Sequence, residues 1–470
     1  MRLGDLAPDL CPGSAVEIEG VTADSRAVRP GMIFAALKGV QADGAAFVPD
    51  ALASGAAAVL CHPSAPVDAP IVLRDEDPRR RLALMAAALA GPQPKTIVAV
   101  TGTAGKTSVA EFTRQIFAAS KLSSASIGTL GIRGAVTVTG GLTTPDPVAL
   151  HRRLSDLAAA GVDHVAMEAS SHGIDQRRLD GVNFVAAGFT NIGRDHLDYH
   201  PTPEAYLEAK LRLFRTLLPE GAPTVVDPDA PGADAVLKVA EKPLTVGRDG
   251  DLIRLKAVRP TADGAVLDLE TASGRFEVLL PLVGGFQVDN ALIAAGLAIA
   301  GGIDEDAAIG ALSALEGAPG RLELVGRKNG APIFVDYAHK PEAITAALSA
   351  IRPRVKGRLV IVIGAGGDRD PGKRPLMGKA ANDGADIVIV TDDNPRSEDP
   401  AKVRAAILEA APGAREIGNR AEAIAAAIAL LGEGDGLVVA GKGHEEGQTV
   451  GGQTFPFSDR ECVLGVLGQS

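Results

Sequence analysis

A glycine-rich loop lies between an apolar segment and a helical segment near residue 100. The stretch reads VAVTGTAGKTSVAEF over residues 98–112, with the spacing Gly102-x-x-Gly105-Lys-Thr. Backbone N–H groups of such a turn, together with the N-terminus of the following helix, bind phosphate oxygens. We therefore predict a phosphate loop in which Lys106 reaches the terminal phosphates and the Thr107 hydroxyl holds Mg²⁺. The loop is two residues shorter than the usual Walker sequence, and ATP is the expected nucleotide because the chain has no NKxD tetrad for guanine.

Three further candidates follow apolar segments of the same region. Glu168 ends the segment HVAMEAS, where a Mg²⁺-binding carboxylate would lie, and His196 lies in TNIGRDHLDYH. Lys210 lies on the apolar stripe of a predicted helix over 202–214, with Thr202 as its N-cap. A lysine on such a stripe usually extends its ammonium to solvent, and the helix alone favours that interpretation.

The C-terminal third contains four apolar segments that each end in polar, glycine-bearing residues. In a doubly wound sheet, ligands bind at the carboxyl ends of the strands, so we expect the four loops to converge on one crevice. One loop places two carboxylates, an amide and Arg396 on a turn stiffened by Pro395. An ordinary strand-to-helix loop capped by Ser397 or Asp399 is the alternative. The segments are PIFVDYAH (332–339), RLVIVIGAGGDRD (358–370), DIVIVTDDNPR (386–396) and GLVVAGKGHE (436–445).

Two breaks divide the chain into three expected α/β domains. A chain of 470 residues exceeds the size at which one core keeps growing. The proline-containing stretch GPQPK (91–95) and the stretch EGAPGRLE (316–323) are the candidate linkers. We predict a small α/β domain over 1–95, a P-loop domain with a parallel sheet over 96–318, and a Rossmann-like domain over 319–470.

Composition narrows the class of partner. The net charge of −11 argues against nucleic-acid binding, which needs clustered Lys and Arg, so the expected partners are small molecules. The longest apolar run, at 291–303, is too short to span a bilayer, and the N-terminus lacks a signal peptide's apolar core. Three widely separated cysteines match no metal-ligand spacing and indicate reduced thiols. A cytoplasmic protein without membrane insertion is expected.

The motifs taken together resemble the Mur ligases, ATP-dependent amide-forming enzymes of peptidoglycan precursor synthesis. GTAGKT, MEASSHGIDQRR, TNIGRDHLDYH, AKLRLF, GRLE, VDYAHKPEA, GAGGDRDPGKRP, TDDNPR and GKGHE occur in family order over almost the whole chain. Within the family, DNPR with GDRDPGKRP and GKGHE is similar to the enzyme that adds meso-diaminopimelate to UDP-N-acetylmuramoyl-L-alanyl-D-glutamate. The resemblance implies a UDP-sugar-binding first domain, an ATP-binding central domain, an amino-acid-binding third domain and a monomer.

The implied chemistry runs through an acyl phosphate. A carboxylate does not form an amide directly at pH 7 because its oxygen is a poor leaving group, whereas phosphorylation by ATP activates it. By resemblance, Lys106, Glu168 and His196 align the anionic groups and Mg²⁺. Lys210 would react with CO₂ to give a carbamate that holds a second Mg²⁺. A carbamate needs a neutral amine, and burial lowers the pKa of an amine.

The resemblance assigns residues to each ligand. For ATP they are Gly102, Thr103, Ala104, Gly105, Lys106, Thr107, Ser108, Asn290, Arg321 and Asp336. For the UDP-muramoyl dipeptide they are Ala23, Ser25, Val40, Gln41, Ala42, Thr143, Thr144, Ser170, Gln176 and Arg178. For meso-diaminopimelate they are Arg374, Asp393, Asn394, Pro395, Arg396, Gly441 and Glu445. The implied metal ligands are Thr107, Glu168, His196 and carboxylated Lys210.

The far end of diaminopimelate explains the polar turn at 393–396. This end is a zwitterion, whose carboxylate suits a guanidinium and whose ammonium suits carboxylates and carbonyls. Lysine lacks that carboxylate. A bound lysine would leave Arg374 and Arg396 unpaired, so the site is expected to reject it.

Three departures from the family pattern and three alternatives accompany this interpretation. Leu142 and Gln287 stand where asparagine is common, and Gly447 stands where an aromatic residue often occurs. The alternatives are a lysine-adding relative, a folylpolyglutamate synthetase-like ligase, and a P-loop kinase or nucleotide switch.

Overall fold

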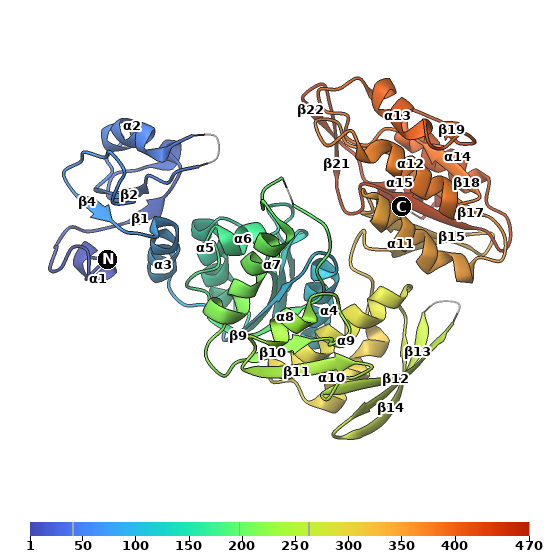
Figure 1. Cartoon of the computed structure of the whole chain (residues 1–470), viewed down its shortest axis with the longest axis horizontal. Coiled ribbons are helices and arrows are strands. Elements are labelled where there is room, and N and C mark those ends of the chain that lie inside the picture. Colours follow the sequence, from blue (N-terminus) through green and yellow to red (C-terminus); the bar gives the residue numbers. More distant parts are fainter. Residues whose placement is uncertain (40–41, 197, 262–263, 470) are drawn as a thin grey trace. The chain divides into compact units, whose positions relative to one another are not determined.

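The computed structural model describes residues 1–39, 42–196, 198–261 and 264–469 (Figure 1). Packing of the backbone divides them into two compact units, which are described separately. The first unit comprises Met1–Ala257, Asp268–Phe276 and Asp289–Leu312, and the second comprises Val258–Leu267, Glu277–Val288 and Ser313–Ser470. The boundaries of the three expected domains stay a prediction.

The N-terminal part of the first unit is a small parallel sheet covered by helices. Its strands pair in the order β1-β2-β3-β4, and every pair is parallel. The predicted alanine-rich helix is α3, which begins at Pro78 and packs Leu82 and Met85 into the core. The elements are α1 (Leu3–Leu6), β1 (Gly20–Thr22), η1 (Ser25–Ala27), β2 (Met32–Ala35), η2 (Gly44–Phe47), α2 (Val48–Ala53), β3 (Ala58–Cys61), β4 (Val72–Arg74) and α3 (Pro78–Ala90).

A larger sheet, most of whose residues belong to the first unit, carries the phosphate loop. Within the described residues its order is β14-β13-β12-β11-β10-β9-β5-β8-β6-β7. The strands from β10 to β6 pair in parallel, as expected for apolar strands buried on both faces. The strands are β5 (Thr96–Thr101), β6 (Ser124–Gly128), β7 (Gly131–Gly134), β8 (His164–Glu168), β9 (Phe184–Phe189), β10 (Pro223–Val226), β11 (Lys242–Gly247), β12 (Ile253–Pro260), β13 (Ala265–Thr271) and β14 (Gly274–Leu280).

Helices cover this sheet, and two of them begin where the sequence predicted. Helix α4 begins at Lys106, and α7 begins at Pro203 with the Thr202 side chain accepting from Ala205 N–H. The helices are α4 (Lys106–Ala119), α5 (Pro147–Ala159), α6 (Ser171–Asp175), α7 (Pro203–Arg212), the π-helical turn η3 (Leu213–Leu217), α8 (Ala233–Leu237), α9 (Gly285–Ala300), α10 (Glu305–Ala311) and η4 (Leu312–Ala314).

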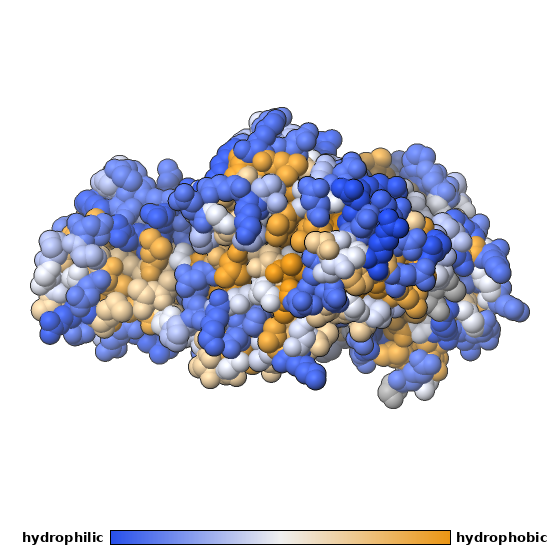
Figure 2. Space-filling view, turned by 90° about the horizontal axis from the view of Figure 1, so that it is seen from below, coloured by the Kyte–Doolittle hydropathy of each residue, from blue (hydrophilic) through white to orange (hydrophobic). Residues whose placement is uncertain are grey.

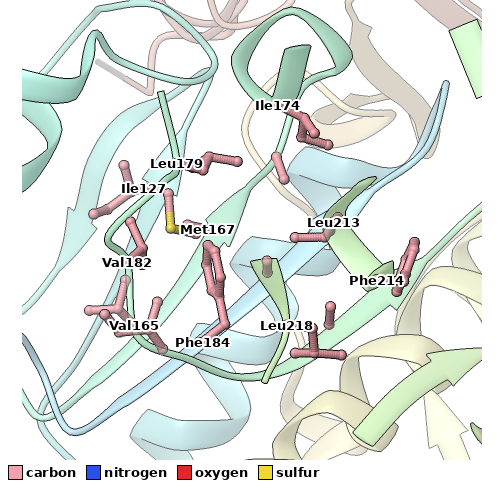
Figure 3. Close-up of a cluster of buried hydrophobic side chains, with 14 of the residues drawn as sticks. Ile127, Val165, Met167, Ile174, Leu179, Val182, Phe184, Leu213, Phe214 and Leu218 are labelled. Carbon is pink, nitrogen blue, oxygen red and sulfur yellow. The ribbon is translucent and has the colours of Figure 1, made fainter. Parts of the chain in front are cut away.

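A buried apolar cluster supports the polar end of β8. Figure 3 shows side chains of β6, β8, β9 and η3 gathered around Met167. Met167 is buried in this cluster together with Val165 and Phe184, and the next residue, Glu168, is the last of the strand. Burial of these apolar side chains therefore fixes the position of β8 and, with it, the position of Glu168 at the end of the strand.

The second unit is a doubly wound domain. The strands of its main sheet pair in the order β15-β16-β20-β17-β18-β19, with β15 antiparallel and the others parallel, and β21 and β22 form a separate antiparallel pair. Helices α11, α12 and α13 pack in one apolar core, and α14 and α15 pack in another. The four predicted apolar segments are thus confirmed as adjacent parallel strands, β16, β20, β17 and β18. The elements are β15 (Glu323–Lys328), β16 (Ala331–Asp336), α11 (Pro341–Ile351), η5 (Arg352–Arg354), β17 (Leu359–Ile363), α12 (Lys373–Gly384), β18 (Ile387–Val390), α13 (Pro400–Leu408), β19 (Arg415–Glu416), α14 (Arg420–Ala429), β20 (Gly436–Ala440), β21 (Gly447–Val450), β22 (Gln453–Pro456) and α15 (Asp459–Leu467).

The surface carries mixed polarity. On the face that Figure 2 shows, apolar residues lie in groups with hydrophilic residues between them. Across the described ranges, no helix is both long enough and apolar enough to cross a membrane. The three cysteines are free thiols, as the sequence predicted.

Candidate active site

The phosphate loop joins the end of β5 to the start of α4, and two glycines shape it. Gly102 and Gly105 have φ values of +153° and +88°, a region that favours glycine. A Cβ at Gly102 would collide with the Thr190 hydroxyl, and a Cβ at Gly105 would collide with the side-chain oxygen of Asn290. The loop therefore requires glycine at both positions, and Asn290, predicted to lie near the nucleotide, is in contact with it.

Hydrogen bonds from the end of β9 hold the loop in place. Thr103 N donates to the Asn191 carbonyl oxygen at 2.9 Å, and Ala104 N donates to Asn191 Oδ1 at 3.1 Å. Lys106 Nζ donates to the carbonyl oxygens of Gly102 and Thr103, both at 3.0 Å. The Lys106 ammonium thus lies against the loop whose backbone N–H groups are expected to donate hydrogen bonds to phosphate oxygens. Ser108, the last predicted loop residue, is buried in the first turn of α4.

Thr107 and Glu168 form a site suited to Mg²⁺. Thr107 Oγ1 donates to Glu168 Oε2 at 3.1 Å, and Thr129 N donates to Glu168 Oε1 at 2.7 Å. Gly128 makes room for this carboxylate, because a Cβ there would collide with it. Among the residues that the structure describes, no three His, Cys, Asp or Glu side chains form a metal site. A hydroxyl, one carboxylate and phosphate oxygens are nevertheless the oxygen ligands that Mg²⁺ commonly takes.

Lys210 is buried against the same loop. Its side chain is 1% exposed, and Nζ donates to the Gly102 carbonyl oxygen at 2.7 Å. The ammonium lies 4.4 Å from the centre of the Tyr206 ring. Burial lowers the pKa of Lys210 well below its usual value, and the nearby Lys106 lowers it further, while Asp195 opposes the shift. The interpretation of Lys210 as a solvent-directed lysine is therefore wrong, because helix α7 turns this position towards the phosphate loop.

His196 lies in a cluster of rings beside α7. Its Nε2 is 3.6 Å from Asp195 Oδ2, and its ring centre is 4.7 Å from that of His172 and 6.0 Å from that of Tyr206. Burial lowers the pKa of His172 to about 4, and the charges of His196 and His200 add to the shift. His172 is therefore a neutral ring beside His196 at pH 7.

The residues predicted for the muramoyl peptide form one hydrogen-bonded network that ends at Glu168. Thr144 Oγ1 donates to the Glu168 carbonyl oxygen at 3.1 Å, and Ser170 Oγ donates to Thr144 Oγ1 at 3.0 Å. Arg178 Nη1 donates to the Thr144 carbonyl oxygen at 2.7 Å, and Arg178 Nη2 donates to Gln176 Oε1 at 2.7 Å. The structure thus joins four of these positions, which lie up to 34 residues apart in the chain.

Thr143 and Leu142 lie at the edge of this network. The Thr143 hydroxyl is 3.0 Å from the Thr129 hydroxyl, which itself donates to Glu168 Oε2 at 3.2 Å. Leu142 is 58% exposed, so the position where asparagine is common presents an apolar side chain to solvent.

Two of the residues predicted for uridine line a cavity in the first unit. Ala23 and Ser25 border a cavity of about 890 Å³ whose other walls include Phe47, Asp146 and Arg152. Ala42 is exposed, its carbonyl oxygen accepts from Gly39 N at 2.9 Å, and it is not among the described residues that line the cavity. Val40 and Gln41 lie outside the described residues.

Arg321 and Asp336 lie together in the second unit. Leu322 N and Ala338 N donate to the two oxygens of the Asp336 carboxyl, at 2.6 and 2.8 Å. Burial raises the pKa of Asp336 to about 6, although the Arg321 guanidinium opposes the shift. Arg321 lies 4.6 Å from the centre of the Tyr337 ring. Gln287, the second departure from the family pattern, donates from Nε2 to the Arg321 carbonyl oxygen at 3.1 Å.

The turn 393–396 is held by hydrogen bonds to loops that follow other strands. Asn394 Nδ2 donates to Glu445 Oε2 at 2.8 Å. Arg396 has a φ of +52°, its N–H donates to the Thr449 carbonyl oxygen at 2.9 Å, and its Nη1 donates to the Gly367 carbonyl oxygen at 2.6 Å. The loops that follow β17, β18 and β20 therefore meet at this end of the sheet, as predicted for three of the four loops. The helix cap also exists, since the Asp399 side chain accepts from Ala401 N at 2.9 Å and begins α13.

Arg374 and Gly441 complete the set predicted for diaminopimelate. Arg374 is buried and forms a two-pronged pair with Glu398, with Nη1–Oε2 and Nη2–Oε1 distances of 2.9 and 2.8 Å. This guanidinium holds the pKa of Glu398 below its usual value. Gly441 has a φ of +118°, and a Cβ there would lie 3.3 Å from Asp393 Oδ2. Pro395 contributes its carbonyl oxygen, which accepts from Glu398 N at 3.0 Å.

Comparison with known proteins agrees with this geometry. The family models named Mur ligase family, catalytic domain; Mur ligase middle domain; and Mur ligase, glutamate ligase domain match residues 17–91, 100–298 and 320–443. A UDP-N-acetylmuramoyl-L-alanyl-D-glutamate--2,6-diaminopimelate ligase from Rhizobium meliloti (strain 1021) is 54% identical over 484 residues, which cover 100% of both chains. The chain belongs to the Mur ligase family. The resemblance inferred from the motifs is confirmed.

Solved structures extend the comparison. A structure of UDP-N-acetylmuramoyl-L-alanyl-D-glutamate--2,6-diaminopimelate ligase is 34% identical to this Mur ligase, with a TM-score of 0.74, and the match covers 100% of this chain and 99% of that one. A Mycobacterium tuberculosis folylpolyglutamate synthase, complexed with ADP and AMPPCP, is 21% identical with a TM-score of 0.63 over 77% of this chain and 92% of that one. The second likeness concerns the fold alone.

Sequence reasoning missed several residues of the Mur ligase site. Glu398 and Lys442 contact the residues predicted for diaminopimelate, and His172 and Tyr206 pack around His196 and Lys210. Glu398 lies two residues after the motif TDDNPR, and Lys442 lies within GKGHE. Their closeness to these motifs could have identified both as candidate site residues. Tyr206 lies four positions before Lys210 on α7, a spacing that places both side chains on one helix face, so it could also have been found. The contact of His172 with His196 joins α6 to the loop that precedes α7, and no spacing in the sequence indicates it.

Proposed function

We propose that this Mur ligase uses ATP to join meso-diaminopimelate to UDP-N-acetylmuramoyl-L-alanyl-D-glutamate through an acyl phosphate. The observation that carries the proposal is the 54% identity, over the whole chain, to a relative that bears the name of this ligase. The geometry of the two units supplies a separate argument for each ligand. The cytoplasmic location and the monomeric state stay predictions.

ATP would bind with its phosphates along the loop from Gly102 to Ser108. The N-terminus of α4 and the Lys106 ammonium favour negative charge there. Asn290 lies in contact with the loop, and Arg321 and Asp336 of the second unit are proposed to bind the ribose and phosphates. Bound Mg²⁺ would neutralise phosphate charge during transfer, and Thr107 and Glu168 would hold it.

Carboxylation of Lys210 would complete the metal-binding residues. The lowered pKa favours the neutral amine, whose nitrogen lone pair can attack the carbon of CO₂. The N–C bond forms, one C–O π bond becomes a carboxylate oxygen, and the amine loses a proton to solvent. The product would be an anionic ligand beside Lys106 and the loop. His196, whose ring centre is 6.0 Å from that of Tyr206 in α7, is proposed to align the phosphate that is transferred.

The muramoyl substrate would bind across the first unit. Ala23 and Ser25, with Val40, Gln41 and Ala42, are proposed to bind uridine, because two of them line the cavity next to α5. The network of Thr143, Thr144, Ser170, Gln176 and Arg178 is proposed to bind the peptide, because it runs from Arg178 to Glu168. A substrate carboxylate held by this network would lie near the Mg²⁺ residues, where it could attack the γ-phosphorus of ATP.

Diaminopimelate would bind in the second unit, around Asp393, Asn394, Pro395 and Arg396. Its distal carboxylate would pair with the Arg396 guanidinium. It could also pair with Arg374 by displacing the Glu398 carboxylate from that guanidinium. Its distal ammonium would lie against Asp393, Glu445 and the backbone at Gly441. Its other amine then attacks the acyl carbon, phosphate leaves, and the amine loses a proton.

The test is phosphate release with ATP, Mg²⁺ and UDP-N-acetylmuramoyl-L-alanyl-D-glutamate, comparing meso-diaminopimelate with L-lysine. Turnover confined to diaminopimelate is the expected result. Equal turnover with lysine would keep the ligase and overturn the role of the two arginines. Turnover with a folate substrate, or ATP hydrolysis that needs neither amine, would favour the folylpolyglutamate or nucleotide-switch alternatives.

A further inference from the structure

Lys442 is a fully buried lysine in the turn that follows β20. Its side chain is 0% exposed, although lysine is almost never fully buried unless it is paired. Gly441 and Gly443 flank it with φ values of +118° and +57°. A Cβ at Gly443 would lie 2.8 Å from the Tyr337 Cβ, so the turn packs too closely for any other residue. The backbone of this turn thus places the Lys442 ammonium inside the domain instead of in solvent.

The three hydrogen-bond partners of the ammonium within the described part of the chain belong to the proposed diaminopimelate site. Lys442 Nζ is 3.2 Å from Asn394 Oδ1, 3.4 Å from Asp393 Oδ1 and 3.4 Å from Glu445 Oε2. Asn394 also donates to Glu445 at 2.8 Å, so the amide and the ammonium together fix the Glu445 carboxylate. These partners lie in two separate loops, so Lys442 ties the loop that follows β18 to its own loop after β20.

The charges explain why a lysine is needed here. Asp393 is buried and the Glu445 side chain is 33% exposed, and two carboxylates beside one ammonium repel each other, so removing the cation would favour their moving apart. Lys442 Nζ lies 3.4 Å from a carboxylate oxygen of each residue, so its formal positive charge offsets one of the two formal negative charges and leaves the group at −1. One net negative charge suits one substrate ammonium.

We propose that Lys442 is a positioning residue that sets the spacing and net charge of Asp393 and Glu445 for the distal ammonium of the amine substrate. The inference rests on the proposed function, because that function assigns both carboxylates to diaminopimelate. It adds a residue that acts through its neighbours and does not itself contact the substrate.

The first test is Lys442→Met in the full chain, which keeps the length of the side chain and removes its charge. Charged hydrogen bonds are typically strong, so the KM for meso-diaminopimelate is expected to rise by about 10- to 100-fold. The KM values for ATP and the UDP-muramoyl dipeptide are expected to change by less than about twofold, since other residues bind them. Lys402→Met, at an exposed position of α13, is the matched control and should change none of the three.

A double variant separates charge balance from packing. Glu445→Gln alone leaves the group neutral, Lys442→Met alone leaves two unbalanced carboxylates, and Lys442→Met with Glu445→Gln restores one net negative charge. The KM for diaminopimelate is expected to be lower in the double variant than in either single variant. If Lys442→Met alone does not fold, comparing the double variant with Glu445→Gln makes the same test.

The outcomes are distinguishable. A KM in the double variant as high as the product of the two single effects, or an equal rise in all three KM values, would overturn the role of Lys442 and leave the proposed function intact. No turnover of diaminopimelate by the unsubstituted enzyme would overturn the proposed function and this inference with it.

Discussion

Each unit of this Mur ligase buries a lysine at its candidate site, and the two lysines have different surroundings. Lys210 in the first unit donates to a neutral carbonyl oxygen, that of Gly102, and lies near a second ammonium, that of Lys106. Lys442 in the second unit lies among two carboxylates and an amide. Burial is nearly complete for both, so burial alone does not distinguish their roles.

The difference shows that the partners of a buried lysine decide its chemistry. A neutral partner and a nearby positive charge favour the uncharged amine, which is a nucleophile and can take up CO₂. Carboxylate partners favour the charged ammonium, which is unreactive but organises the groups around it. We therefore expect Lys210 to act in chemistry and Lys442 to act in substrate positioning.

The largest expected effect tests the chemical role of Lys210. Lys210→Ala should lower kcat/KM by about 10²- to 10³-fold, because it removes a charged group near the transferred phosphate. Formate or acetate should restore part of the activity by replacing the carbamate. Lys238→Ala, at an exposed lysine of the same unit, is the control. Full activity without rescue would end the carbamate hypothesis, and rescue of Lys442→Met by the same anions would contradict the distinction between the two lysines.

A smaller effect is expected at Arg396, the guanidinium proposed to pair with the distal carboxylate of diaminopimelate. Arg396→Gln should lower the ratio of kcat/KM for diaminopimelate to that for L-lysine by about 10- to 100-fold, because only diaminopimelate has a distal carboxylate. The measurement is initial phosphate release with each amine. Arg415→Gln, at an exposed arginine in β19, should leave the ratio unchanged. An unchanged ratio in Arg396→Gln would place substrate discrimination elsewhere in the second unit.

The metal requirement tests the proposed Mg²⁺-binding residues of the first unit. Glu168→Gln should raise the Mg²⁺ concentration for half-maximal rate by about tenfold, because a charged oxygen ligand becomes a neutral one. The titration is made at saturating ATP and both other substrates. Glu220→Gln, at an exposed glutamate, provides the baseline. If the Mg²⁺ concentration for half-maximal rate is the same in Glu168→Gln and the unsubstituted enzyme, Glu168 is not a metal ligand.

The smallest expected effect concerns stability and pH in the second unit. Burial lowers the pKa of both His339 and His444 to about 4, from 6.5. The unfolded chain therefore binds these protons at a higher pH than the folded chain, and the free energy of unfolding should fall as the pH decreases from about 6.5 to about 4. His444→Gln should make the urea midpoint fall less steeply in that window. His62→Gln, at an exposed histidine of the first unit, should leave the slope as it is.

Much of the fold could be predicted because local patterns carry it. The strands at 96–101 and 164–168, the helix starts at Lys106 and Pro203, and the strands of the second unit follow from apolar runs, prolines and capping residues. The phosphate loop could be predicted because glycine spacing and a following helix are local features. Arg374 was predicted as a substrate residue, but its pairing with Glu398 was not, because it joins residues 24 positions apart.

Residue types and their spacings along the chain were enough to predict the class of fold, the phosphate loop and the family. Which charges meet depends on long-range packing. It placed Lys210 on the Gly102 carbonyl 108 positions away, and it buried the pair Arg420–Asp459 at 2.7 Å between residues 39 positions apart. Long-range packing sets the solvent exposure and the charged neighbours of each side chain, and these two quantities determine its pKa and its reactivity. The physical difference between Lys210 and Lys442 therefore exists only in the folded protein.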